Sequence, residues 1–309
     1  MKVIISGGSG LIGEALVRDL IKDKHHVIVL SRNPEKARRS LPAGVEIAGW
    51  DARTSNGWGH LVDGADAIVN LAGENISGER MFPSRWTAER KQRILQSRID
   101  AGAAIVEAVR LAKTKPNFLI QASAIGYYPP NTSRGQVESD PPGTGFQPSV
   151  LKQFEDSTTP VEEMGVRRVI TRSGVVLSNK GGAFIPQALP FKMFVGGPLG
   201  SGKQCYSWIH IADEVAAIRY LLESPSASGV YNVTSPMPVT NREFGRTLAR
   251  VMKRPFWMPV PAFALKLVFG EVSEILLDGW WVLPQRLTEM GFKFRYPDPE
   301  SALRNLVGK

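Results

Sequence analysis

Short apolar runs alternate with amphipathic stretches through the first half of the chain. Six of these runs are β-branched or apolar almost throughout, which is typical of strands buried on both faces of a parallel sheet. They are residues 3–6, 27–31, 45–50, 67–70, 117–123 and 166–172. Segments with helical periodicity lie between them, notably 11–22 and 86–112. This alternation predicts βαβ units and therefore an α/β, Rossmann-type fold with a doubly wound parallel sheet.

The pattern loosens after residue 172. Residues 180–207 are rich in glycine and proline and carry few helix signals. Helices are expected over 212–223, 242–253, 263–277 and 284–290, with a strand near 230–234. We therefore expect a smaller, mainly helical C-terminal lobe. The predicted division assigns residues 1–174 and 208–234 to the sheet domain, and 175–207 and 235–309 to the second lobe.

The amino-acid composition limits the kinds of metal site and cross-link that the chain can form. The single cysteine, Cys205, excludes a disulfide within the chain and a cysteine-based zinc site. Four histidines leave little for a histidine-based metal site, so no metal is expected. The chain shows neither a targeting segment nor an apolar run of the ~18 residues that a membrane span needs. A cytoplasmic protein is the expectation.

The charge balance indicates which kinds of binding partner to expect. Thirty-eight basic and 29 acidic residues give a net charge of +9. The basic residues are dispersed along the chain, without a basic run interleaved with aromatic residues, so neither nucleic acid nor membrane is expected as a partner. A small-molecule substrate is expected instead. An anionic compound stays open, with Arg85, Lys91 and Arg98 as candidates to face it. Both a monomer and a homodimer are compatible with the sequence.

A glycine-rich segment follows directly on the first predicted strand and opens the first predicted helix. It reads Gly7-x-x-Gly10-x-x-Gly13. Gly7 permits a tight turn, Gly10 lets the backbone approach a pyrophosphate, and Gly13 lets the helix pack on the strand. The free N–H groups at the start of the helix, around Leu11 and Ile12, would point at the phosphates. The segment predicts a dinucleotide-binding loop in which these five residues contact the cofactor.

The end of the second predicted strand bears on the choice between the two nicotinamide cofactors. An NAD-preferring site places Asp or Glu there, to accept a hydrogen bond from the ribose 2′-hydroxyl. This chain has Ser31 and Arg32 instead, and a guanidinium pairs with a 2′-phosphate through charge-assisted bidentate bonds. NADP is therefore predicted, with Ser31, Arg32 and, after the third strand, Asp51 among its contacts. The alternative for Arg32 is an ordinary exposed residue after a strand.

Taken together, these features resemble the extended form of the short-chain dehydrogenase/reductase superfamily. The segment from Asn70 to Gly73 ends the fourth predicted strand, where that superfamily runs past the cofactor, and Ser123 ends the fifth, where it keeps its catalytic serine. More narrowly, the chain resembles an atypical epimerase-like family, similar to nucleoside-diphosphate-sugar epimerases and often labelled "cell division inhibitor". The stretches that carry this resemblance are 70–76, 85–91, 172–178, 196–202, 208–210 and 239–244.

The resemblance implies specific site residues. It places Leu71, Ala72 and Gly73 along the cofactor. Arg98 falls near the superfamily's helix asparagine, where it could hold an anion or the nicotinamide ribose, the alternative being a structural ion pair. Ser123 is the one member of the superfamily's catalytic set that this chain retains.

The superfamily's Tyr-x-x-x-Lys pair is absent from this sequence. Alignment places Gln147 at the tyrosine position and Leu151 at the lysine position. Tyr127 and Tyr128 lie just beyond Ser123, and either phenol could act as the acid; the alternative is that each forms a wall of the pocket. A phenol without a neighbouring lysine has a pKa of about 10, so it donates a proton to a carbonyl more readily than it abstracts one from an alcohol.

Two functions follow from these residues. The first is an NADP(H)-dependent oxidoreductase or epimerase acting on a small polar carbonyl or hydroxyl compound, with a nucleotide sugar among the candidates. The sheet domain would bind NADP and the second lobe the substrate. The alternative is an NADP-binding sensor or scaffold without hydride chemistry, which the missing Tyr-Lys pair supports.

The assignment of Arg32 predicts the cofactor preference. NADPH should bind more tightly than NADH, and Arg32→Ala should weaken NADPH binding while leaving NADH nearly unchanged, because only the 2′-phosphate needs the guanidinium. Titration of both cofactors by fluorescence or calorimetry measures this. Equal weakening of the two, or an initial preference for NADH, would show that Arg32 does not read the 2′-phosphate.

Overall fold

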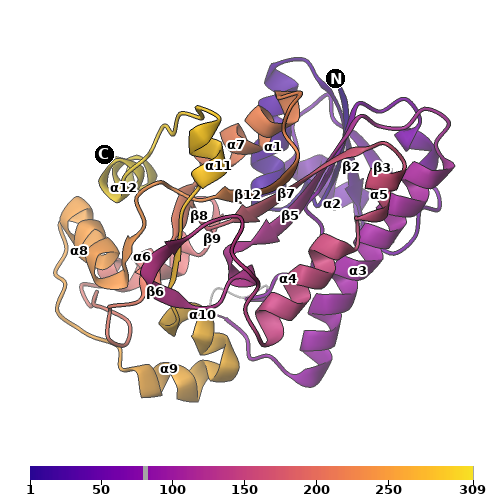
Figure 1. Ribbon diagram of the computed structural model, residues 1–309. Helices are drawn as coiled ribbons and strands as arrows, with labels where there is room; N and C mark the ends of the chain where they lie inside the picture. Colours follow the sequence, from indigo (N-terminus) through magenta and orange to yellow (C-terminus); the bar gives the residue numbers. More distant parts are fainter. Residues whose placement is uncertain (79–82, 309) are drawn as a thin grey trace.

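A seven-stranded parallel sheet forms the centre of the protein. The computed structural model describes residues 1–78 and 83–308 (Figure 1). The strand order is β12-β7-β5-β4-β1-β2-β3, and every neighbouring pair is parallel. The strands are β1 Lys2–Ser6, β2 His26–Ser31, β3 Glu46–Gly49, β4 Ala67–Asn70, β5 Phe118–Ala124, β7 Arg167–Ser173 and β12 Gly229–Val233. The predicted Rossmann-type, doubly wound sheet is confirmed.

Helices cover both faces of this sheet. Along β1, Val3 and Ile5 pack on one side and Ile4 on the other, because successive side chains of a strand alternate between faces. The first side is covered by α1 (Leu11–Lys22) and α7 (Ile211–Glu223). The second is covered by α3 (Ala88–Leu111), α5 (Pro160–Glu163) and the short helix η1 (Gly59–Val62). Two further helices flank the sheet domain, α2 (Pro34–Ser40) and α4 (Phe146–Asp156).

The C-terminal part forms its own small core around Phe184, Trp208, Phe244 and Leu303. Three minor sheets lie outside the main one: β11-β8-β9, β10-β13 and β14-β6. Their strands are β6 Asn131–Gln136, β8 Val175–Ser178, β9 Gly181–Gly182, β10 Cys205–Tyr206, β11 Trp208–His210, β13 Val239–Thr240 and β14 Trp280–Val282. The remaining helices of the described residues are η2 Ile125–Tyr127, α6 Phe184–Lys192, α8 Asn241–Met252, α9 Ala262–Phe269, η3 Gly270–Ser273, α10 Glu274–Leu277, α11 Gln285–Glu289 and α12 Pro299–Val307.

Two sequence expectations for this part need correction. Residues 180–207 carry few helix signals in the sequence, yet α6 forms there despite Pro190, because Phe184, Ala188 and Phe191 share one face and are buried. The long helix expected over 263–277 is divided into α9, η3 and α10, with Gly270 at a φ of +61° between the first two. The domain division itself stays a prediction, although β11, placed in the sheet domain, pairs with β8 of the second lobe.

Among the residues that the structure describes, no helix is long and apolar enough to span a bilayer. Within the same residues, no group of three or more His, Cys, Asp or Glu side chains is arranged to hold a metal ion.

Glu214 on α7 is a buried carboxyl group within this fold. The Ser173 hydroxyl donates a hydrogen bond to Glu214 Oε1 at 2.6 Å, while Oε2 has no hydrogen-bond partner among the described residues. Burial raises the pKa of Glu214 to about 8. The folded protein therefore holds a proton on Glu214 at pH values where the unfolded chain has lost it.

This proton makes stability depend on pH. Between 4.5, the ordinary pKa of a glutamate, and the folded pKa of about 8, the folded state binds more protons than the unfolded state, so stability falls as pH rises and levels off above about 8. Glu214→Gln should remove this loss, with a gain over the parent protein that grows to the order of a few kcal/mol at pH 8. Chemical denaturation from pH 5 to 9 measures it. The exposed Glu163→Gln is the control, and a pH-independent difference for Glu214→Gln would contradict the prediction.

Candidate functional site

The candidate site lies where the central strands end. A row of buried polar side chains crosses three of them: Ser6 Oγ donates to Asn70 Oδ1 at 2.6 Å, and Asn70 Nδ2 donates to Gln121 Oε1 at 2.9 Å. Ser6 Oγ also accepts from the backbone N–H of Ala72 at 3.3 Å. These bonds fix the start of the loop after β4 against the end of β1, next to the glycine-rich segment.

The glycine-rich segment has the geometry that close approach by a cofactor requires. Gly7 has a φ of +69°, and a Cβ there would lie 2.8 Å from the carbonyl carbon of Leu71. A Cβ on Gly13 would lie 2.3 Å from the Gly7 carbonyl oxygen. A Cβ on Gly10, in contrast, would meet only that oxygen, at 3.2 Å, and otherwise open space. Gly7 and Gly13 are thus needed for packing, while Gly10 faces free room.

The N-terminus of α1 borders this free room. Gly10 is the N-cap residue, and no side chain of the described residues caps the helix. The first N–H groups of a helix have no partner within it, so those around Leu11 and Ile12 remain available to an anion. The residues present therefore fit the pyrophosphate of a dinucleotide, and the predicted contacts of these residues with a cofactor stay a prediction.

Arg32 follows β2 as an exposed side chain. It makes no hydrogen bond or ion pair with the residues described, so its guanidinium is available to a ligand. Ser31 is already used locally, because its hydroxyl accepts from the Asn33 N–H at 3.1 Å. The Asp51 carboxylate accepts from the backbone N–H groups of Arg53 and Thr54, both at 2.8 Å, and these bonds, that of Thr54 first, lower its pKa. A cofactor contact of Asp51 stays a prediction.

Arg98 lies beside the loop after β4. A Cβ on Gly73 would be 3.1 Å from the Arg98 guanidinium carbon, which also lies 5.6 Å from the centre of the Phe154 ring. Its one hydrogen bond to a described residue is donated to the Ile94 carbonyl, at 2.8 Å. Burial lowers the pKa of Arg98 to about 10, opposed only by the charge of Glu74. A cation so placed, without an ion pair in the described chain, favours an anionic or polar ligand.

The other two basic candidates for the substrate are engaged elsewhere. Arg85 donates to the backbone carbonyls of Leu267 and Val268, at the end of α9. Lys91 forms an ion pair with Glu271 of η3. Both side chains therefore connect the sheet domain to the α9–η3 region, whereas Arg98 lies beside the loop after β4.

Ser123, at the end of β5, belongs to a buried polar network. Its hydroxyl donates to Glu155 Oε1 at 2.6 Å. Arg172 binds both carboxylate oxygens of Glu155, each at 2.8 Å, and donates a third bond to the Tyr128 hydroxyl at 2.9 Å. Tyr128 in turn donates to Asn232 Oδ1 at 2.8 Å. The network joins β5, α4, β7 and β12 directly beneath the candidate site.

The two candidate tyrosines differ in exposure. Tyr128 is fully buried, and burial raises the pKa of its phenol to about 12, against the opposing effect of Arg172. Tyr127 is only partly buried, and the centre of its ring lies 3.4 Å from the Arg172 guanidinium carbon. No hydrogen bond holds the Tyr127 hydroxyl among the described residues. This arrangement favours Tyr127 over Tyr128 as the phenol that meets a substrate.

Gln147 borders the same loop. A Cβ on Gly126 would lie 3.0 Å from the Gln147 Oε1 atom and 3.4 Å from Leu151. The positions that align with the tyrosine and lysine of the superfamily thus lie beside the loop after β5, but they carry an amide and an alkyl group. A carboxamide can hydrogen-bond a substrate oxygen but cannot transfer a proton to it at neutral pH.

Sequence reasoning missed three members of the network: Glu155, Arg172 and Asn232. Their burial was the missing information, because charged side chains are almost never fully buried unless they are paired. The signal available was indirect: Arg172 opens a stretch that carries the family resemblance, and Glu155 lies in the helix that aligns with the superfamily.

The network predicts that removing the hydroxyl group destabilises the protein at Tyr128 and hardly at all at Tyr127. Tyr128→Phe should lower the free energy of unfolding by about 1–3 kcal/mol, because Arg172 and Asn232 each lose one of their buried hydrogen bonds. Tyr127→Phe should change stability by less than about 0.5 kcal/mol, because its hydroxyl makes no bond to the described residues. Urea denaturation of both variants measures the difference. Equal costs would show that Tyr128 is not held as described.

Comparison with known proteins places the chain in a family. Residues 3–234 match the NAD dependent epimerase/dehydratase family, and residues 260–306 match a domain of unknown function, DUF1731. An epimerase family protein of Staphylococcus aureus is 37% identical over 309 residues, covering 99% of both chains. Another, of Staphylococcus saprophyticus, is 39% identical over 305 residues and 98% of both chains.

Solved structures agree with this assignment. The crystal structure of the human epimerase family protein SDR39U1 with NADPH is 30% identical, has a TM-score of 0.89 and covers 100% of both chains. The nucleoside-diphosphate sugar epimerase of Corynebacterium glutamicum is 28% identical, with a TM-score of 0.76, over 99% of this chain and 58% of that one. The resemblance inferred from the motifs is confirmed, and the chain belongs to the NAD dependent epimerase/dehydratase family as an epimerase-like member.

Proposed function

We propose that the protein is an NADP(H)-dependent oxidoreductase or epimerase acting on a small polar carbonyl or hydroxyl compound, with nucleotide sugars as the first class to test. One observation carries the proposal. The open room at Gly10, the free guanidinium of Arg32 and the partly exposed phenol of Tyr127 all lie at the ends of parallel strands, where α/β sheets bind their ligands.

The preference for NADP rests on Arg32, which has the position and the free charge to meet a 2′-phosphate. The NADPH present in the human SDR39U1 structure supports this choice. The residues that would hold the cofactor are Gly7, Gly10 and Gly13 with the start of α1 at the pyrophosphate, and Arg98 beside Gly73 at the far side of the loop. NADPH, when bound, is a hydride donor for a carbonyl carbon.

Tyr127 would supply the proton that a reduced carbonyl oxygen needs. The Arg172 guanidinium carbon lies 3.4 Å from the centre of the Tyr127 ring, and this cation–π contact holds the ring in place. The Glu155 carboxylate, bound to Arg172 by two hydrogen bonds, fixes the position of the guanidinium. The residue four positions after Tyr127 is Asn131 and not the lysine of the superfamily, so proton donation during reduction is favoured over abstraction from an alcohol.

Ser123 is placed to accept a hydrogen bond from a substrate. Its one proton is already donated to Glu155, so in this arrangement its oxygen is an acceptor. We propose that Ser123 orients the substrate by accepting from a substrate hydroxyl, while Gln147 offers amide hydrogens to a substrate oxygen. Both residues would position the substrate, and a substrate with several hydroxyl groups offers the oxygen atoms that these hydrogen bonds need. Residues 175–207 and 235–309 would supply the rest of the substrate pocket.

A sensor or scaffold that binds NADP without hydride chemistry is the second candidate. The specific observation in its favour is the amide of Gln147 and the alkyl chain of Leu151 where the superfamily has its tyrosine and lysine. This function predicts tight NADPH binding with no consumption of the cofactor.

The deciding experiment follows NADPH absorbance with a panel of sugar nucleotides and small keto compounds. With a substrate that is turned over, Tyr127→Phe should lower turnover by about 10²–10⁴-fold with NADPH affinity unchanged, since a general acid is lost. Ser123→Ala should chiefly raise the KM. Gly10→Val is the control that should lose cofactor binding altogether while keeping its fold, because the added side chain occupies the open room.

Each outcome has a definite meaning. Full activity in both Tyr127→Phe and Ser123→Ala would refute the proposed constellation. Tight NADPH binding that Gly10→Val abolishes, combined with no consumption by any carbonyl compound, would establish the sensor function instead.

A further inference from the structure

The positive charge of the protein is concentrated in two segments of the C-terminal part. Residues 179–207 and 235–270 contain nine lysines and arginines against a single acid, Glu243, so they account for a charge of +8 out of the net +9 of the chain. The basic residues are Lys180, Lys192, Lys203, Arg242, Arg246, Arg250, Lys253, Arg254 and Lys266. Among the described residues, only Arg250 of these forms an ion pair, with Glu300. Almost all of the excess positive charge therefore belongs to these two segments.

The same two segments expose most of the large apolar side chains. Nine of the eleven exposed large hydrophobic residues in the described chain belong to them. The most exposed are Phe263 at 73%, Leu267 at 72%, and Trp257 and Met193, both at 63%. The remaining five are Ile185, Phe194, Met237, Met258 and Val268. Scattered exposed apolar residues need no explanation, but a concentration of this kind marks an interaction surface.

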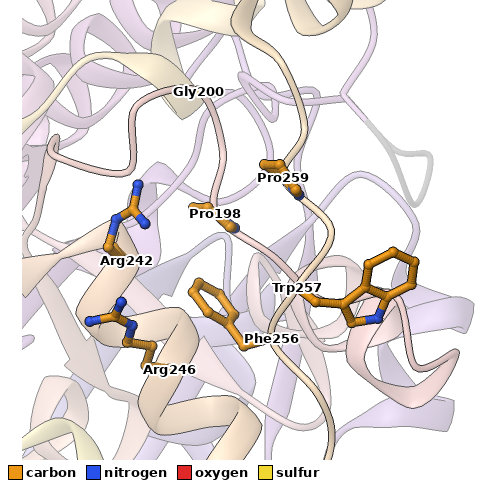
Figure 2. A pocket seen from close by; sticks show the side chains of 7 residues that line it. All are labelled: Pro198, Gly200, Arg242, Arg246, Phe256, Trp257 and Pro259. Carbon is orange, nitrogen blue, oxygen red and sulfur yellow. The ribbon is translucent and has the colours of Figure 1, made fainter.

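Direct contacts join the basic and apolar side chains into one surface. The Trp257 indole donates to the Phe194 carbonyl at 2.9 Å, and the Arg254 guanidinium lies 4.3 Å from the centre of the Phe194 ring. Arg242 and Arg246 line a pocket of about 300 Å³ together with Trp257, as Figure 2 shows. Pro198, Gly200, Phe256 and Pro259 complete its wall. We call this surface, with α9 beside it, the basic–apolar face.

The pocket has free positive charge. Arg242 uses one nitrogen to donate to the Ser201 carbonyl at 2.9 Å, which holds its side chain against the loop after Gly200. Arg246 makes no hydrogen bond or ion pair with the described residues. The two arginines are four positions apart in α8 and therefore lie on one side of that helix. Such a pair can bind a phosphate group between them.

α9 turns its apolar side to solvent. Leu265 is its one buried residue, and Phe269 packs on a small core with Trp86. Phe263 and Leu267 lie one helical turn apart on the outer side, with Lys266 next to them. A helix that is anchored by one side and exposes aromatic and aliphatic side chains on the other, flanked by lysine, has the composition of an interfacial helix.

We infer that the basic–apolar face docks on an anionic membrane surface. Arg242 and Arg246 would contact lipid phosphates, while Trp257, Phe263 and Leu267 enter the boundary between head groups and acyl chains. This is binding to a surface, and no helix needs to cross the bilayer. A second copy of the chain is a poorer occupant, because a symmetric dimer would place this strongly positive surface against itself. It departs from the expectation, drawn from the sequence, that no membrane is a partner, and it does not depend on the proposed function.

Vesicle binding tests the inference with matched variants. The full chain should sediment with vesicles of phosphatidylcholine and phosphatidylglycerol in 0.15 M salt, and not with phosphatidylcholine alone. Leu267→Ser should weaken binding roughly tenfold by removing a buried apolar group, whereas Leu111→Ser, at 65% exposure on α3, should bind like the parent. Arg246→Glu should weaken binding on the order of tenfold, whereas the exposed Lys113→Glu, with the same change in net charge, should not.

Depth of insertion gives a second measurement that does not depend on those variants. Brominated acyl chains should quench part of the tryptophan fluorescence of the bound protein, and Trp257→Phe should abolish that part. Indifference to phosphatidylglycerol, or equal binding by Leu267→Ser and Leu111→Ser, would overturn the inference. Binding of duplex DNA that is lost in Arg246→Glu and kept in Leu267→Ser would also overturn it, because the partner would then be a nucleic acid. A dimer in solution that Leu267→Ser dissociates would overturn it as well, because a second copy would then occupy the face.

Discussion

The ion pair between Arg172 and Glu155 is the interaction on which the candidate site depends. It connects β7 to α4 with two hydrogen bonds of 2.8 Å, and both side chains are buried. A buried charge that loses its partner costs several kcal/mol, so each residue of the pair requires the other. Ser123 and Tyr128 each add one hydrogen bond to the pair. The end of β5 is thereby held against α4 and, through Tyr128, linked to β12.

The same pair shapes the chemistry that the site can perform. By taking the proton of Ser123 and the hydroxyl of Tyr128, it leaves Tyr127 as the phenol with an uncommitted hydroxyl in the described part of the loop. The superfamily uses a lysine to favour loss of the tyrosine proton. Here a guanidinium lies over the ring, and its charge is shared with a carboxylate. Without a lysine in that place, the proposed role of Tyr127 is to give a proton to a substrate and not to take one from it.

Local patterns predicted the sheet domain well and the second lobe poorly. α1 spans residues 11–22 as predicted, because the glycine-rich turn marks its start and apolar spacing marks its length. β6 was not predicted, because Asn131–Gln136 is polar and becomes a strand only through pairing with β14, which follows almost 150 residues later. The cofactor loop could be predicted from glycine spacing. The Glu155–Arg172 pair could not, because nothing in one sequence shows which distant charges are buried together.

The strand β14 has a consequence for the order in which the protein is made. The Trp280 indole donates to the Tyr128 carbonyl at 3.0 Å, and the Trp280 carbonyl accepts from the Ser207 hydroxyl at 2.6 Å. On a ribosome the N-terminal strands emerge first and can begin to fold. The loop that carries Tyr127 and Tyr128, however, lacks its contact with Trp280 until β14 has been synthesised. A nascent chain should acquire its nucleotide-binding strands early and its complete site only after β14 has emerged.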